Sequence, residues 1–119
     1  MKQHGGRIWI QGAGELASGV ALRLFRSGYR IIMAEIANPL AVRRLVCFSE
    51  AVYEGRAEVE GVAACLVSPQ DAKFERDLIT VSIDPEGEAL SRLGSEAVID
   101  ARLTKQPPVP LPVNDALLI

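Results

Sequence analysis

The sequence predicts an α/β protein with a Rossmann-like, doubly wound and mostly parallel sheet that carries a small β-hairpin insertion. Strand-like apolar runs alternate with amphipathic helical segments along the chain. The first strand, helix and strand occupy about 30 residues, as in a βαβ unit. The glycine-rich string "GAGELASG" joins the first strand to the first helix. At 119 residues and 49% apolar composition, we expect residues 1–119 to form a single domain of this kind.

The first half of the chain supplies the clearest elements. The short apolar run Arg7–Gln11 predicts a strand. Apolar residues at helical spacing follow the glycine turn and predict a helix, which Gly28 is suited to end. Arg30–Glu35 is almost continuously apolar, which is typical of a strand buried on both faces of a parallel sheet.

The middle of the chain departs from simple alternation. In "ANPLAVRRL", the asparagine and the proline that follows it predict a short helix. The string "FSEAVYEG" predicts another turn of helix that ends at Gly55. We interpret "AEVEGVAACLV" as two short strands joined at Glu60-Gly61, an insertion into the α/β pattern.

The second half returns to alternating elements. We expect "SPQDAKFERD" to be a helix, "LITVSID" a strand, "DPEGEALSRLG" a helix that opens at Asp84-Pro85, and "EAVID" a strand. Four prolines in "TKQPPVPLPVND" predict an extended segment, either a surface connector or a functional lid. The final "ALLI" is an added strand, a contact with a partner subunit, or the point where a longer protein is cut.

Composition excludes several classes of function. The net charge is −2 and the basic residues are scattered, so we expect no nucleic-acid partner. No apolar run approaches the ~20 residues of a membrane-spanning helix. We therefore expect a cytoplasmic protein without a membrane partner, with Cys47 and Cys65 as reduced thiols. With His4 as the single histidine, we expect no catalytic residue and no metal site, and the chain is a binding platform more than a catalyst.

The turn "GAGELA" matches Gly-x-Gly-x-x-Ala, a variant of the dinucleotide-binding fingerprint. Gly12 permits the tight turn after the strand, and Gly14 keeps side chains away from a pyrophosphate that would approach the backbone around Ala13. Ala17, and Gly19 beyond it, allow the helix to pack closely on the sheet. The N–H groups at the start of the helix favour a bound phosphate.

Two acidic residues bear on this turn. Glu35 ends the second strand about 20 residues further on, where a carboxylate can accept hydrogen bonds from ribose hydroxyls. Glu15 lies inside the turn, where its carboxylate either repels phosphate or complements the helix dipole from outside. A strand-to-helix corner also needs glycine for its own sake, so a phosphate cradle and a structural corner both remain open.

Other charged residues are predicted to lie at the same edge of the sheet. Asp84 and Asp100 end apolar strands as Glu35 does, and ligands of doubly wound sheets bind at the carboxyl ends of the strands. For Asp84, an N-cap role at the next helix competes with ligand binding and is the better-supported one. The candidate cationic contacts are Arg43, Arg44, Arg102 and Lys105, of which the first two also fit a solvated helix face.

The segments "GAGELASGVALRL", "EIANPLAVRRLVCFSEAVYEG", "DPEGEAL" and "VIDARLTK" resemble the YqeB-type proteins over about residues 7–119. These are accessory proteins of the selenium-dependent molybdenum hydroxylase system, and their fold is related to the XdhC-type chaperones. The resemblance implies a maturation role, in which a molybdopterin-type or nucleotide-bearing cofactor is bound and passed to a hydroxylase. It also implies that Arg43, Arg44, Ser49, Glu50 and Tyr53 lie beside the glycine turn, and that the chain matches the N-terminal half of a longer protein.

Three functions follow as expectations. The first is a non-catalytic, homo-oligomeric maturation factor that binds a small-molecule cofactor and contacts a molybdenum hydroxylase. The second is the NAD-binding domain of an oxidoreductase, which Gly12, Gly14, Ala17 and Glu35 favour. The third is a nucleotide-sensing regulatory domain of Rossmann type. The expected cofactor is accordingly a molybdopterin-type molecule or a dinucleotide such as NAD.

Overall fold

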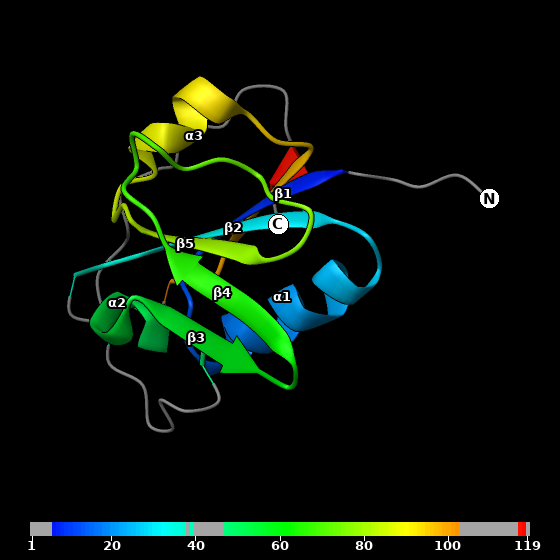
Figure 1. Cartoon of the computed structure of the whole chain (residues 1–119). Coiled ribbons are helices and arrows are strands. Elements are labelled where there is room, and N and C mark those ends of the chain that lie inside the picture. The colour runs from blue at the N-terminus through cyan, green and yellow to red at the C-terminus, as the bar shows by residue number, and fades with distance from the viewer. Residues whose placement is uncertain (1–5, 38, 40–46, 103–116, 119) are drawn as a thin grey trace.

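A computed structural model describes residues 6–37, 39, 47–102 and 117–118, in which seven strands form one sheet (Figure 1). The strands lie in the order β3-β4-β5-β2-β1-β6-β7. The strands are β1 (Arg7–Gln11), β2 (Arg30–Glu35), β3 (Arg56–Val59), β4 (Val62–Leu66), β5 (Ile79–Ile83), β6 (Ala97–Asp100) and β7 (Leu117–Leu118). The helices are α1 (Glu15–Arg26), α2 (Glu50–Glu54) and α3 (Glu88–Leu93).

The strand order positions the candidate site. Strand β3 pairs with β4 in antiparallel orientation, and all other paired strands of the described sheet are parallel. When the β3–β4 hairpin is set aside, the remaining five strands lie in the order 3-2-1-4-5 by chain position. This order is consistent with a Rossmann-like fold, and the predicted mostly parallel α/β architecture is confirmed. In chain order, β2 and β5 lie on one side of β1, whereas β6 and β7 lie on its other side. The strand order therefore reverses at β1, between β2 and β6.

Helices cover both faces of the sheet. Alternate residues of each strand point to opposite faces, so Ile8 and Ile10 join one core cluster and Trp9 joins the other. The first cluster is closed by α1, α2 and the inner face of the hairpin, and the second by α3 and the segment around Phe74. Figure 1 shows α1 and α2 on one side of the sheet and α3 on the other.

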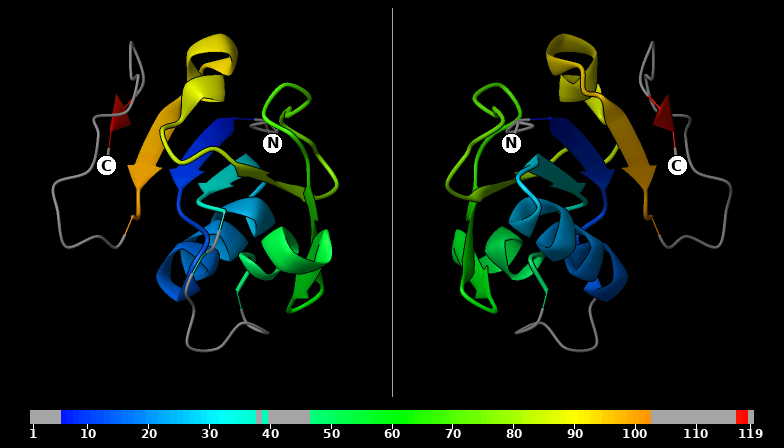
Figure 2. Two further views of the ribbon diagram at one scale, coloured as in Figure 1. Left: turned by 90° about the vertical axis from the view of Figure 1, so that its left-hand side faces the viewer. Right: turned by 90° about the vertical axis from the view of Figure 1, so that its right-hand side faces the viewer.

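Several predicted elements are confirmed. Strands β1 and β2 have the predicted bounds, and α2 ends at Gly55 as expected. The hairpin forms with its turn at Glu60 and Gly61, whose φ angles of 50° and 84° are both positive, as a type I′ turn requires. Figure 2 shows how the β3–β4 hairpin lies at one edge of the sheet beside α2.

The helix predicted over residues 68–77 is wrong. This segment forms a single turn, in which the Ser68 hydroxyl donates to the Asp71 carboxylate and the Asp71 N–H donates to the Ser68 carbonyl. The rest runs without regular structure and places Ala72 and Phe74 against the second core cluster. Packing on the sheet therefore overrides the local Ser-Pro start signal.

The third helix begins later than predicted. It starts at Glu88 because Gly87 adopts a left-handed conformation with φ 69°, which separates the Asp84-Pro85 turn from the helix. The helix predicted in residues 37–45 and the proline-rich segment 104–115 fall almost entirely outside the described residues. Of the final "ALLI", Leu117 and Leu118 pair with β6 in parallel orientation, so the expected last strand is present. None of the described helices is long and apolar enough to cross a membrane.

Candidate functional site

The glycine turn directly follows β1 and lies beside the end of β6. Gly12 has φ 122°, and a Cβ atom built there would lie 2.9 Å from the carbonyl oxygen of Ala101, which follows β6. The Gly12 N–H donates to the Ala34 carbonyl of β2 at 2.6 Å. The conformation and the crowding both require glycine, so the predicted role of Gly12 in a tight turn is confirmed.

Gly14 is different, because neither its backbone conformation nor the space around it requires glycine. Its φ of −73° and ψ of −164° are open to any residue, and a Cβ atom would meet no described atom within 4 Å. Gly14 is the N-cap of α1 and supplies no side-chain acceptor to the first N–H groups of the helix. Ala17, one turn on, is 2% exposed and packs in the first core cluster, as predicted for close contact between helix and sheet.

The carboxylate of Glu35 holds the turn in place. Its Oε1 atom accepts a hydrogen bond from the Ala13 N–H at 2.7 Å, and its Oε2 atom accepts one from the Ile36 N–H at 2.9 Å. The carboxyl end of β2 is therefore tied to the centre of the glycine turn. A ribose hydroxyl at Glu35 would share oxygen atoms that already accept these two bonds.

A second set of hydrogen bonds attaches the start of α2 to the same turn. The hydroxyl of Ser18 donates to the Ala13 carbonyl at 3.0 Å and accepts from the Phe48 N–H at 2.8 Å. The Ser49 N–H also donates to the Ala13 carbonyl, at 3.0 Å. Ser49 thus lies beside the turn, as the family resemblance implies, whereas Tyr53 donates its hydroxyl to the Pro39 carbonyl. Sequence reasoning missed Ser18, whose signal is a polar residue on the apolar face of the helix.

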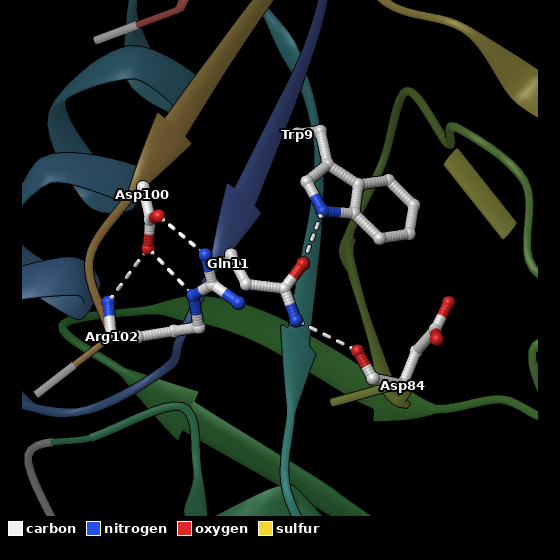
Figure 3. A network of polar contacts seen from close by, with 5 residues as sticks. All are labelled: Trp9, Gln11, Asp84, Asp100 and Arg102. Atoms are coloured by element: carbon white, nitrogen blue, oxygen red, sulfur yellow. Dashed lines mark hydrogen bonds and ion pairs between the residues drawn. The ribbon is translucent and has the colours of Figure 1, made fainter. Parts of the chain in front are cut away.

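Gln11 links two strands across the end of a third (Figure 3). Its amide nitrogen donates to the Asp84 carbonyl at 2.7 Å, and its amide oxygen accepts from the Trp9 indole N–H at 2.8 Å. The residue beside Gln11 on β2 is Ala34, whose small side chain leaves room for the amide to cross toward β5. Sequence reasoning also missed Gln11. A glutamine at the end of an apolar strand is a signal for such a residue, because a buried amide group requires hydrogen-bond partners.

Asp84 serves the start of α3. Its two carboxylate oxygens accept hydrogen bonds from the N–H groups of Glu88 and Ala89, each at 2.8 Å, and the residue is 4% exposed. The predicted helix-start role of Asp84 is confirmed, although Gly87 occupies the N-cap position itself. With both oxygens bound to α3 and almost no exposed surface, Asp84 is not placed to contact a ligand.

Asp100 and Arg102 form a bidentate ion pair at the end of β6 (Figure 3). Arg102 donates from Nε to Oδ1 of Asp100 at 2.8 Å and from Nη2 to Oδ2 at 2.6 Å. The hydrogen bond from the Arg102 guanidinium holds the pKa of Asp100 below its ordinary value. Asp100 thus occupies the Nε–Nη2 edge of the guanidinium, one of the edges through which an arginine can bind a phosphate with two hydrogen bonds.

The remaining predicted residues divide into two groups. Gly19 and Glu15 are exposed on α1, and a Cβ atom at Gly19 would meet no described atom within 4 Å. The close-packing role predicted for Gly19 is therefore wrong. Arg43, Arg44 and Lys105 lie outside the described residues. Within the described part of the chain, no three His, Cys, Asp or Glu residues gather where they could hold a metal ion.

The fold and the turn define the class: an α/β protein with a dinucleotide-type glycine turn at the carboxyl edge of a mostly parallel sheet. Over 102 residues, the chain is 45% identical to the uncharacterized protein YqeB of Escherichia coli (strain K12). This homology confirms the YqeB-type resemblance over the matched residues. No family profile and no solved structure matches the chain.

The match covers the two proteins unequally. It includes 83% of this chain but 19% of the relative, so the chain spans about a fifth of the length of the relative it matches. That share is smaller than the half of a longer protein that the sequence led us to expect.

Proposed function

We propose that this Rossmann-like domain is a cofactor-binding accessory module whose glycine turn holds a phosphate group of the cofactor. The observation that carries the proposal is the open position at Gly14. A side chain there would be tolerated by the described chain itself, so the glycine is explained by a ligand that approaches the backbone.

The surroundings of Gly14 support an anionic ligand. The residue caps the amino-terminal end of the twelve-residue helix α1, where N–H groups without intrahelical partners and the helix dipole favour negative charge. The turn is held by Glu35, Ser18 and Ser49, so its backbone is preorganised before a ligand arrives. The site lies between β1 and β6, where ligands of open α/β sheets bind.

The biological role that we propose is maturation of a molybdenum hydroxylase, of the selenium-dependent type, in the cytoplasm. It rests on the resemblance of four segments of the sequence to YqeB-type accessory proteins. The cofactor is then a molybdopterin or its nucleotide form, either of which carries the phosphate that the glycine turn would hold.

An NAD-binding domain of an oxidoreductase is the second candidate. The strand order and the position of Glu35 at the end of β2 favour it, since an acidic residue there serves the adenosine ribose of NAD. Both carboxylate oxygens of Glu35 already accept hydrogen bonds from backbone N–H groups, which counts against ribose binding as the sole role of this residue.

Calorimetric titration with NAD, ADP, AMP and molybdopterin in its free and nucleotide forms tests the phosphate site. The Gly14→Val variant is compared with Gly19→Val, which adds the same side chain to an equally open position on the exposed face of α1. We expect Gly14→Val to abolish binding and Gly19→Val to preserve it, with both variants folded by circular dichroism. A folded wild-type chain that binds none of the panel, or equal binding by both variants, would refute the proposal.

A second experiment separates the two candidates. The chain is loaded with molybdopterin and added to a molybdenum hydroxylase that lacks its cofactor, and hydroxylase activity is followed over time. Accessory function predicts activity above that of free molybdopterin, and Gly14→Val is expected to remove the gain. Binding of NAD in the calorimeter without any such gain would favour the oxidoreductase domain.

A further inference from the structure

Strand β3 has one edge that pairs with no other described strand. It is the last strand of the sheet on the hairpin side, with β4 as its neighbour (Figure 2). An edge strand presents a row of N–H and C=O groups that can pair with another chain.

The register of the hairpin identifies which groups point outward. The Leu66 N–H donates to the Gly55 carbonyl, and the paired residues that follow are Arg56 with Cys65 and Ala57 with Ala64. Because bonded and non-bonded pairs alternate in an antiparallel ladder, Gly55, Ala57 and Val59 direct their backbone groups toward β4. Arg56 and Glu58 therefore direct theirs away from the sheet.

The side chains at this edge are charged and complementary. Arg56 and Glu58 are exposed and lie on the same face of β3, opposite to the face on which Ala57 and Val59 join the core. Neither takes part in an ion pair among the described residues. The edge therefore carries one positive and one negative side chain, two residues apart, that are available to a partner.

We propose that β3 pairs with β3 of a second copy of this chain, in antiparallel orientation about a two-fold axis at Ala57. In this register Arg56 of each copy lies opposite Glu58 of the other, and the outward backbone groups of both residues exchange hydrogen bonds. The two neighbouring symmetric registers, centred on Arg56 and on Glu58, would place two arginines or two glutamates directly opposite each other, which is destabilising. Charge thus selects both the partner and the register.

The pairing gives the homo-oligomer expected from the sequence a definite interface, independent of any ligand at the glycine turn. It also places the two α2 helices on the same side of the joined sheets, because α2 packs on the core face of β3. Tyr53, which is 45% exposed on α2, lies on that side and can add apolar contact between the copies.

Sedimentation over a concentration series tests the interface in the wild-type chain and four variants. Arg56→Glu and Glu58→Arg each set like charges opposite each other twice by symmetry, and we expect each to weaken dimerisation by about tenfold or more. The double variant R56E/E58R restores opposite charges in the same register and should recover the dimer. Arg23→Glu makes the same charge change on the exposed face of α1 and should have no effect.

Glu58→Pro provides a test through the backbone, because proline removes the outward N–H while the bonds from β3 to β4 remain. We expect this variant to be monomeric and folded. A wild-type chain that stays monomeric at all concentrations, or a dimer that survives both single charge reversals, would overturn the proposal. Failure of the double variant to recover the dimer would overturn the register and with it the inference.

Discussion

Replacement of Gly12 by alanine should destabilise the protein, whereas the same change at Gly14 should not. At Gly12 the new methyl group would be held at φ 122° and would lie 2.9 Å from the Ala101 carbonyl oxygen. A non-glycine residue in such a conformation costs about 1–3 kcal/mol, and forced contacts in a packed region cost a similar amount. Since Ala101 is itself bonded to Gln11 through its N–H, relaxation is limited, and we expect a loss of about 2–4 kcal/mol.

At Gly14 the terms nearly cancel. Alanine is a poorer N-cap than glycine, which costs several tenths of a kcal/mol. Alanine also lowers the entropy of the unfolded chain, which contributes about 0.4–1 kcal/mol in the opposite direction. The backbone conformation and the open space at Gly14 add no further penalty, so the net change should stay within about 0.5 kcal/mol.

Urea denaturation followed by circular dichroism measures both effects. For Gly12→Ala the midpoint should fall by about 1–2 M with an unchanged slope, whereas Gly14→Ala should have the wild-type midpoint. Equal destabilisation by the two substitutions would show that Gly14 is also required by the fold. The inference that its glycine serves a ligand would then lose its basis.

Substitutions at three further positions test single features of the structure. Gly19→Ala should stabilise the chain by about 0.5–1 kcal/mol in urea denaturation, because alanine loses less backbone entropy than glycine in a helix and its methyl group meets no described atom within 4 Å. No gain would contradict the exposed position of Gly19. Asp84→Ala should cost about 1–3 kcal/mol by the same assay, since it leaves two N–H groups of α3 without acceptors, and Asp84→Asn should cost less. The pKa of Asp100 is lowered in the folded state, so the unfolded chain takes up its proton first and stability should fall as the pH drops below about 5. Asp100→Asn should make this acid loss smaller in thermal melts taken from pH 6 to pH 3, and an identical loss in both proteins would mean that the ion pair contributes nothing measurable.

The unit from β1 to β2 could be predicted residue by residue because its signals are local. An apolar run, a glycine turn, helical spacing and a second apolar run each determine the structure of their own segment. The hairpin turn was predictable for the same reason, since Glu60-Gly61 between two apolar stretches favours the observed conformation. Elements with such internal signals need no knowledge of distant contacts.

The helix expected over residues 68–77 shows where local signals fail. Ser68 and Pro69 are typical of a helix N-terminus, and the chain does turn there. Ala72 and Phe74, however, pack against the second core cluster of the sheet, which a continued helix does not provide for. That face is otherwise covered by the six-residue helix α3, which is too short to close it alone. Nothing within the segment reveals this requirement, which arises from the assembled sheet.

The candidate site divides in the same way. The glycine turn and Glu35 were predictable from spacing, whereas the hydrogen bond that joins them comes from the parallel pairing of β1 with β2. Gln11 was missed because a polar residue after an apolar run has a simpler interpretation, in which the strand ends there and the side chain is exposed to solvent. The pairing of Arg102 with Asp100 was within reach, since residues two apart on an extended chain share a face.

That pairing leads to a final prediction about how a phosphate is recognised. Among the described residues, the start of α1 at Gly14 presents N–H groups that have no intrahelical partner, while the guanidinium of Arg102 is already engaged by Asp100. If the phosphate contacts the backbone at Gly14, Arg102→Lys should change the affinity for the bound nucleotide or molybdopterin by less than about twofold. The same substitution replaces a planar, bidentate donor by a point charge, so it should bring the pKa of Asp100 closer to its ordinary value. Calorimetry and the acid dependence of thermal melting measure the two effects separately. A tenfold loss of affinity with little change in the acid dependence would mean that Arg102 leaves Asp100 for the ligand, and the site would then be a cationic one rather than a backbone cradle.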